Sequence, residues 1–263
     1  MGPVEISRFE RKFVVSERAA EAIRSFVTGY LPLDEHMTPD HPRGYHIYSL
    51  YLDTPSRKLY RQSCDGIKNR YKLRIRFYDT KEEGPAFLEI KQRTTETVHK
   101  MRAIVSKRAA ASMLQSGWIS PADLLNQSAA SIRALDEFCQ RREQLKAEGT
   151  VFVSYIREAF VSQAAESARV TFDREIAGRP YDPSVGLTVP DDEAMVNMNG
   201  VVLELKYNGR RPSWMHDLIT SFALQRLSFP KYVYAMDALG FDQHKTGAVA
   251  GYANCRFISP VMN

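Results

Sequence analysis

The sequence predicts an α+β fold in which about eight antiparallel strands close into a barrel, with helices packed on its outside. Two observations carry this prediction. About eight segments alternate apolar and polar side chains, which is the period of a strand with one buried face, and their polar positions hold mostly Lys, Arg and Glu. Residues 70–79, RYKLRIRFYD, show the pattern most clearly, because Lys72, Arg74 and Arg76 face one side and aliphatic or aromatic residues face the other.

Caps and turn residues separate the predicted elements. Ser16 is placed to cap the first helix, and the Thr54-Pro55 and Asp65-Gly66 pairs mark turns. Strands are predicted over residues 5–15, 46–53, 70–79, 86–93, 96–105, 152–160, 168–176 and 200–208. Helices are predicted over residues 18–30, 106–117, 121–148 and 212–223, with a short helical turn at 57–60 and a turn at 228–232. We expect residues 1–237 to form one domain and residues 238–263 to be a loosely attached C-terminal tail.

Composition narrows the class of protein. The chain has 263 residues, a formal net charge of +5 and a pI near 9.0, which favours anionic partners such as phosphates. Its three cysteines are widely separated, which argues against a disulfide framework or a CxxC metal site and fits a reducing cytosol. No apolar run is long enough to cross a bilayer, and the N-terminus lacks the apolar core of a secretory signal. We therefore expect a soluble, cytoplasmic protein without a transmembrane segment.

The charged strand faces can point to either side of a sheet. If they face water, the apolar faces form the core of a sandwich. If they face inward, charge lines the barrel and the helices cover its apolar exterior. Buried charges are costly unless they are paired or bind a ligand, so a charged interior predicts a polyanion and a metal ion inside it.

The order of the charges favours the inward alternative. Acidic and basic residues stand two positions apart at Glu10 and Lys12, and the same spacing recurs in the pairs Glu89/Lys91 and Glu204/Lys206. No acid stands at that spacing from Lys72, Arg74, Arg76, Arg157 or Arg169. Any one pair is most simply a surface salt bridge of little energetic value. Charged residues on one strand face recur on five strands, however. A few carboxylates among many cations suit the binding of a divalent metal ion together with an oligophosphate.

Several short motifs, in order, resemble the VTC domain, the polyphosphate polymerase branch of the CYTH-like triphosphate tunnel metalloenzymes. They are RFERK (8–12), RIR (74–76), LEIK (88–91), Lys100, YIREAF (155–160), RVTFD (169–173), LELK (203–206) and SFPKY (228–232). The resemblance covers about residues 6–237. It implies an eight-stranded antiparallel tunnel in which the γ-phosphate of ATP is transferred onto a growing polyphosphate chain with Mn²⁺ or Mg²⁺.

The resemblance also implies roles for individual residues. The side chains expected to act on the phosphates are Lys12, Arg74, Arg76, Lys91, Lys100, Arg157, Arg169, Lys206 and Lys231. Substrate binding is expected from Arg8, Lys72, Tyr155 and Ser228. Glu204 is the leading metal ligand, supported by Glu10 and Glu89. In-line transfer between phosphates requires no protein nucleophile, and neither His46 nor His99 is assigned a catalytic role.

One position departs from the hydrolytic relatives, which typically open with an ExExK strand. Arg8 occupies the first acidic position here, and a cation there favours synthesis or binding over water activation.

Three alternatives stay open: an ATP–polyphosphate phosphotransferase, a tunnel triphosphatase, and a non-catalytic polyphosphate or nucleotide binder. The expected partners are ATP and polyphosphate or pyrophosphate. Nucleic acid is not expected, because no exposed aromatics interleave with the cations. A membrane partner is left open without being indicated.

Overall fold

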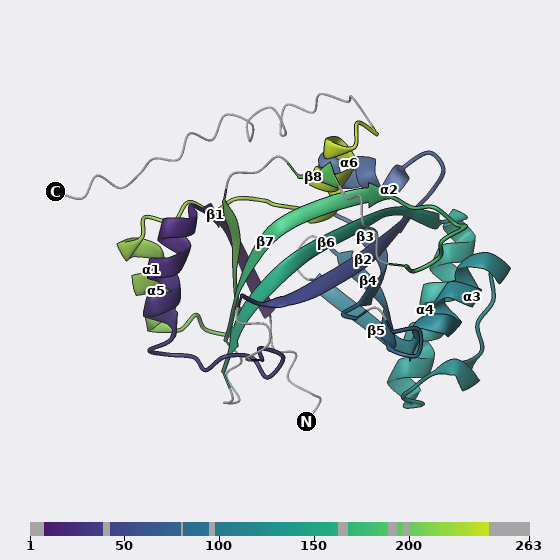
Figure 1. Ribbon diagram of the computed structural model, residues 1–263, viewed down its shortest axis with the longest axis horizontal. Helices are drawn as coiled ribbons and strands as arrows, with labels where there is room; N and C mark the ends of the chain where they lie inside the picture. Colours follow the sequence, from purple (N-terminus) through teal and green to yellow (C-terminus); the bar gives the residue numbers. More distant parts are fainter. Residues whose placement is uncertain are drawn as a thin grey trace.

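A curled antiparallel sheet forms the centre of the computed structural model, and helices pack on its flanks (Figure 1). The structure describes residues 8–38, 43–79, 81–94, 98–162, 168–188, 194–196 and 200–241. The strands are β1 (Arg8–Val15), β2 (Tyr45–Asp53), β3 (Arg70–Phe77), β4 (Pro85–Arg93), β5 (Val98–Ser106), β6 (Glu148–Val161), β7 (Arg169–Pro180), β8 (Ala194–Met195) and β9 (Val201–Asn208). The helices are α1 (Glu17–Val27), α2 (Lys58–Cys64), α3 (Lys107–Ser116), η1 (Pro121–Asp123, a 3-10 turn), α4 (Ala129–Leu145), α5 (Ser213–Ser221) and α6 (Lys231–Ala238).

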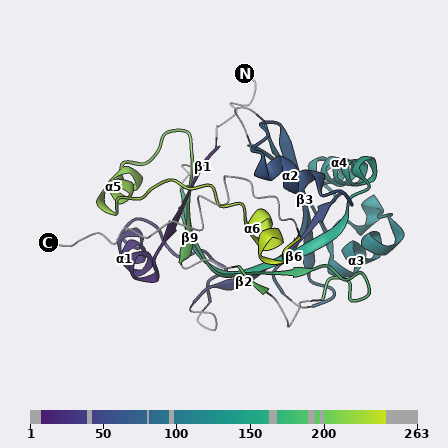
Figure 2. The same ribbon diagram turned by 90° about the horizontal axis from the view of Figure 1, so that it is seen from above.

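The strand order is β1-β9-β7-β6-β2-β3-β4-β5, with the short β8 paired to β7. Each named pair is antiparallel, so the predicted α+β class with external helices is confirmed. Strands β1 and β5 end the order, and the sheet is therefore a half-barrel. Seen from above, it curves around α6 (Figure 2). We call the side that holds α6 the concave face.

Three hydrophobic cores hold the helices on the sheet. On the outer side, α3 and α4 pack on β2–β5 around Leu73 and Phe138, and α1 and α5 pack around Phe13 and Leu203. On the concave face, α6 packs on β2, β6, β7 and β9 around Tyr232. Serine side chains cap α1, α3 and α4 by accepting hydrogen bonds from backbone N–H groups of the first turn. The alternation seen in the sequence thus separates the outer cores from the concave face.

Helix α6 lies directly on β7 because a glycine stands beneath it. A Cβ atom at Gly178 would come 2.8 Å from the Cβ of Ala235 and 3.5 Å from the carbonyl oxygen of Phe152. Real Cβ atoms essentially never approach a carbon atom so closely. Gly178 therefore sets the depth at which α6, and with it Lys231, enters the concave face.

A β-bulge in β7 changes which side chains face inward. The pairing between β6 and β7 shifts between Ser154 and Ile156, and Glu175 on β7 has a φ of 51°. An uninterrupted two-residue period would place Asp173 and Glu175 on one face of the strand. The structure instead buries Asp173 on the concave face and leaves Glu175 exposed, because the bulge interrupts the two-residue period.

Other elements also differ from the prediction. Helix α6 (Lys231–Ala238) begins inside the turn predicted at 228–232, and α2 is longer than the helical turn predicted at 57–60. The predicted helix over 121–148 is divided into η1 and α4. Residues 242–263 of the predicted tail lie outside the described residues, and the domain boundary at 237 stays a prediction. None of the described helices has both the length and the apolar character that crossing a membrane requires.

Candidate functional site

Glu204 of β9 is the centre of the first charged cluster on the concave face. Its Oε1 lies 2.7 Å from Lys12 Nζ on β1 and 3.2 Å from Lys231 Nζ at the start of α6. Its Oε2 lies 2.5 Å from Lys206 Nζ and 3.6 Å from Arg157 Nη2. Burial alone would raise the pKa of the Glu204 carboxyl, but these cations, Lys12 foremost, hold that pKa well below its usual value. Glu204 is therefore an anion at neutral pH.

Asp173 of β7 is a second buried carboxylate beside this cluster. Arg157 Nε and Nη2 donate to Oδ1 and Oδ2 at 2.6 and 2.7 Å, which is the bidentate geometry of a strong charged pair. Lys231 Nζ lies 2.5 Å from Oδ2 and thereby bridges Asp173 and Glu204. Burial opposes ionisation, but Arg157 and Lys231 lower the pKa of Asp173. The two acids thus hold both cations in fixed positions.

Glu10 connects strands that are far apart in the sheet order. Its carboxylate lies 3.2 Å from Lys12 Nζ on β1 and 3.1 Å from Lys91 Nζ on β4. Burial would raise the pKa of Glu10, but Lys12 and Lys91 lower it. The Glu10–Lys91 pair therefore joins the two sides of the half-barrel through side chains.

Glu89 of β4 is the centre of the second cluster and is 1% exposed. Arg74 Nε donates to its Oε2 at 2.6 Å, and Lys100 Nζ lies 2.6 Å from its Oε1. Arg102 Nε and Nη2 also donate to Oε1, at 2.9 and 2.7 Å. The pKa of Glu89 is low because Arg74 and its neighbours outweigh the effect of burial.

Tyr155 of β6 lies between the two clusters. Arg76 Nη2 donates to its hydroxyl oxygen at 3.3 Å. Its ring centroid lies 5.3 Å from Arg157 Cζ and 4.7 Å from Lys231 Nζ, which are cation–π distances. A similar hydroxyl, that of Tyr51, accepts from Arg74 Nη1 at 3.3 Å. Tyrosines thus separate the cations without neutralising them.

The structure brings most of the predicted site residues onto one surface. They are Glu10, Lys12, Lys72, Arg74, Arg76, Glu89, Lys91, Lys100, Tyr155, Arg157, Glu204, Lys206 and Lys231. Arg169 is partly exposed, and its Nη2 contacts Tyr45 Oη at 3.1 Å and Asp34 Oδ2 at 2.9 Å. Ser228 is exposed, in the segment before α6. The side chain of Arg8 lies outside the described residues. The roles predicted for all of these residues stay predictions.

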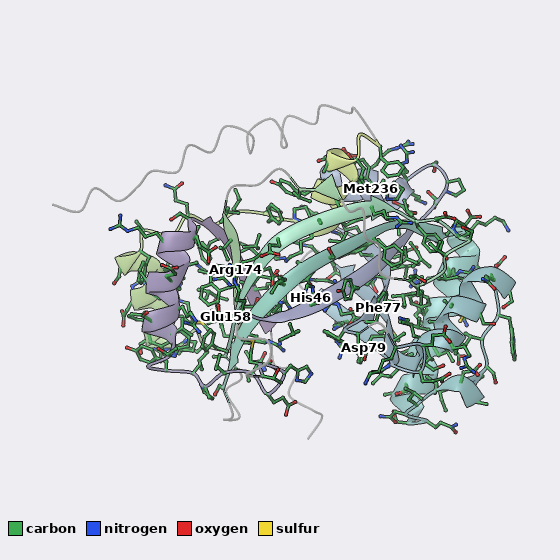
Figure 3. All side chains as sticks on the ribbon, viewed as in Figure 1. His46, Phe77, Asp79, Glu158, Arg174 and Met236 are labelled. Atoms are coloured by element: carbon green, nitrogen blue, oxygen red, sulfur yellow. The ribbon has the colours of Figure 1, made fainter. Side chains whose placement is uncertain are left out.

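A separate network on the outer side shows that buried charge alone does not define the site. Arg174 Nη1 lies 3.1 Å from Glu158 Oε2, and Arg24 of α1 pairs with the same carboxylate. Figure 3 shows Glu158 and Arg174 on the side of the sheet toward α1. His46 is exposed and stacks with Tyr48, also away from the concave face. The pair between Arg24 and Glu158 attaches α1 to the sheet.

The concave carboxylates suit a divalent metal that arrives on phosphate. Mg²⁺ and Mn²⁺ prefer oxygen ligands, and Mg²⁺ is often held by one or two carboxylates together with substrate phosphates. Within the described residues, no three Asp, Glu, His or Cys side chains gather into a ready-made metal site. Glu204 and Glu10, joined by Lys12, would therefore supply only part of the coordination of such an ion. When bound, the ion would neutralise phosphate charge.

Three residues that pair with predicted site residues were not assigned from the sequence: Asp173, Arg102 and Asp34. Asp173 stood in phase with Arg169 and Arg102 in phase with Lys100, so the alternation placed them on the right strand faces. Nothing in a single strand indicates that Asp173 pairs with Lys231, which lies 58 residues later on a helix that was not expected. The same limit hid Asp34, which reaches Arg169 from a loop.

Comparison with known proteins gives one extensive sequence match. The model of the VTC domain family matches residues 7–240. No curated protein matches the chain.

Several solved structures are similar at low identity. A putative adenylate cyclase from Bacillus halodurans is 15% identical, with 85% of this chain and 94% of that chain covered and a TM-score of 0.48. A putative adenylyl cyclase from Hippeastrum, described with a dominant triphosphatase activity, is 13% identical, with 87% and 94% covered and a TM-score of 0.48. PH1819 from Pyrococcus horikoshii OT3 is 11% identical, with 89% and 99% covered and a TM-score of 0.46.

Proposed function

The chain belongs to the VTC domain family, and we propose that it transfers the γ-phosphate of ATP onto a polyphosphate chain bound on its concave face, with Mn²⁺ or Mg²⁺. The observation that carries the proposal is the excess of positive charge on that face. Within the described residues, the four carboxylates that pair with cations of that face, Glu10, Glu89, Asp173 and Glu204, are outnumbered by Lys12, Lys72, Arg74, Arg76, Lys91, Lys100, Arg102, Arg157, Lys206 and Lys231. Packing cations together is unfavourable without a counter-charge, and an extended phosphate chain supplies one.

The chemistry needs positioning and charge stabilisation rather than a protein nucleophile. A terminal oxygen of the acceptor chain attacks the γ-phosphorus of ATP, a new P–O bond forms, and the bond to the β-phosphate oxygen breaks to release ADP. Cations held in place before the reaction stabilise the charge that develops on the phosphoryl oxygens. Asp173 and Glu204 hold Arg157 and Lys231 in such fixed positions, so these acids act as positioning residues.

Glu204 and Glu10 would contribute ligands to the divalent ion that accompanies ATP. Lys12 lies within 2.7 Å of Glu204 and 3.2 Å of Glu10, so an ion bound there must share these carboxylates with an ammonium group. We propose that the protein acts in the cytoplasm. Cys64 and Cys139 are free thiols, which agrees with it.

The test is a polymerisation assay with purified protein, ATP, Mn²⁺ or Mg²⁺ and a pyrophosphate primer. We expect ADP and an acid-labile polymer that migrates as a ladder on a denaturing gel. Orthophosphate without polymer would select the triphosphatase instead. Tight metal-linked binding without turnover would select the non-catalytic binder.

A matched pair of variants tests whether the concave face is the site. Lys91→Ala removes a cation whose side chain is 38% exposed, so the fold should tolerate it. We expect nucleotide and polyphosphate affinity to fall at least about tenfold, since a hydrogen bond to a charged group is lost. Lys146→Ala, at the far end of α4, changes the same charge at a side chain that is 80% exposed and should bind like the wild type. Equal affinity of both variants would remove Lys91 from the site.

A further inference from the structure

Lys72 differs from the other cations of the concave face in what surrounds it. Most of those cations touch a carboxylate, and Arg76 contacts the hydroxyls of Ser49 and Tyr155. No carboxylate of the described residues lies within ion-pair distance of Lys72. Lys72 Nζ lies 5.8 Å from the centroid of the Tyr232 ring on α6. Lys72 therefore stands among the charges of the site without a counter-ion of its own.

The elements around Lys72 add positive charge. Strand register places Lys91 of β4 directly opposite, and that residue in turn faces Lys100 of β5. Like charges at directly opposed strand positions repel each other. Among the described residues, the charged groups that act most strongly on Lys72 are Lys91 on β4, Lys12 on β1, and Arg70 and Arg74 on β3, and the ring of Tyr232 on α6 and the thiol of Cys64 on α2 also lie near it. Each of them is cationic or neutral at pH 7.

Tyr232 cannot readily turn away from Lys72 to make room for a counter-ion. Its hydroxyl donates to Asp53 Oδ2 at 2.6 Å, and its ring stacks on Tyr51 with centroids 4.7 Å apart. Asp53 also accepts from the backbone N–H groups of Leu59 and Tyr60. The aromatic wall beside Lys72 is thus held in place by contacts to β2 and α2, and no carboxylate of the described residues compensates the charge of Lys72 at ion-pair distance.

We propose that Lys72 is a neutral amine in the empty site and gains a proton from solvent when a phosphate chain binds beside it. A charged ammonium is disfavoured in the empty site by lost hydration and by four neighbouring cations, whereas phosphate oxygens reverse the sign of the local field. Burial, followed by Lys91 and Lys12, lowers the pKa of Lys72 well below its usual value, which agrees with this geometry. The inference rests on the proposed function only in placing a phosphate chain on the concave face.

Proton uptake can be measured by calorimetry without metal or ATP. Medium-length linear polyphosphate, whose interior groups are fully ionised at neutral pH, is titrated into the protein in two buffers of equal pH and different ionisation enthalpy. The difference between the two apparent enthalpies gives the number of protons bound. We expect net uptake by the wild-type protein.

Two variants test whether the proton that is taken up binds to Lys72. Lys72→Arg keeps a positive charge that does not titrate, so it should bind the polymer at least as tightly while uptake falls by about one proton per site. Lys72→Met should bind more weakly and show the same loss of uptake. Lys206→Met is the control, because Lys206 also lies on the concave face but contacts Glu204. It should retain the part of the uptake that Lys72→Arg loses.

The possible results separate this inference from the proposed function. Uptake that is absent in the wild type, or equal in the wild type and Lys72→Arg, would overturn the inference. If polymer synthesis fails while uptake depends on Lys72, the inference stands and the proposed reaction does not. If polyphosphate does not bind at all, both are overturned.

Discussion

At the scale of residues, the sequence pattern predicted which way a side chain points better than which side chain it pairs with. Alternation in RYKLRIRF and LELK correctly put Arg74, Lys206 and their neighbours on one face. It could not reveal that Asp173 pairs with Arg157 and Lys231, because that contact depends on the register between β6 and β7 and on an unexpected helix. A two-residue period also fails at Glu175, where a bulge intervenes.

Asp173 is expected to carry much of the stability of the site. Asp173→Ala leaves Arg157 and Lys231 buried with fewer counter-charges, and removing one partner of a buried ion pair costs about 3–5 kcal/mol. Urea unfolding should show a loss of this size. Glu143→Ala, at a side chain that is 79% exposed, is the control and should change the unfolding free energy by less than about 0.5 kcal/mol. A small change in Asp173→Ala would mean that the two cations find water or other partners.

Two lysines should make polyphosphate binding depend on pH. Burial lowers the pKa of Lys100 to about 7 and that of Lys206 to about 8. In the empty protein both ammonium groups therefore lose their charge as pH rises through these values. We expect affinity for polyphosphate, measured without metal, to be highest below pH about 7 and to fall as pH rises to about 9.

Lys206→Arg should flatten the upper part of this profile, since the guanidinium stays charged. Fluorescence anisotropy with a labelled polymer would follow the affinity across the pH range. An affinity that is constant or rises with pH would contradict the assignment of these two lysines to the binding surface.

At the scale of elements, the strands were more predictable than the helix that completes the site. The eight longer strands and the helices α1, α3 and α5 correspond to predicted segments. Helix α6 begins inside the turn predicted at residues 228–232, and Pro230 stands just before its first residue. It also lacks an amphipathic stripe, since Lys231, Tyr232, Val233, Ala235 and Met236 are all buried. A proline just before a helix is compatible with the start of that helix, but a proline alone does not predict one.

The close packing of α6 on Gly178 can be tested by substitution. Gly178→Ala would place a methyl group 2.8 Å from Ala235 Cβ and force α6 outward, at a cost of about 1–3 kcal/mol for overpacking. Because α6 carries Lys231, we also expect weaker polyphosphate binding. Gly29→Ala is the control, since its added Cβ would lie 3.4 Å from the Phe26 carbonyl oxygen, close to an ordinary contact. Both are measured by thermal unfolding and by titration with polyphosphate, and unchanged binding in Gly178→Ala would show that Lys231 keeps its place.

At the scale of the whole molecule, the sequence predicted the fold class and which strand faces meet, but not how far the sheet closes. Periodicity records which side of a strand is buried, whereas closure depends on twist and on the pairing of strands distant in the chain. The inward alternative for the charged faces was correct. The sandwich was wrong, because one sheet curls around its own charged side and around α6.

The paired carboxylates make the stability of the whole protein sensitive to acid. The pKa values of Glu10, Glu89, Asp173 and Glu204 are lowered in the folded state by the cations around them, despite burial. Their contribution is therefore present above their unfolded pKa values and is lost as pH falls toward the folded ones. We expect the unfolding free energy to drop below pH about 4.5, by up to about 1.4 kcal/mol per pH unit for each carboxylate. Urea unfolding at several pH values checks this, and a flat profile down to pH about 3 would contradict it.

The contact between Glu10 and Lys91 has a consequence for how a polyphosphate chain would reach the concave face under the proposed function. A cylinder closed by a ladder of backbone hydrogen bonds admits a thread only through its two openings. Here β1 and β5 are the two edge strands of the sheet. The contact between Glu10 and Lys91 is made by partly exposed side chains, and such an ion pair contributes about 0–1 kcal/mol. Breaking that contact costs little, so under the proposed function a polyphosphate chain would enter the concave face from the side, at any point along its length, and would not need a free end to thread through.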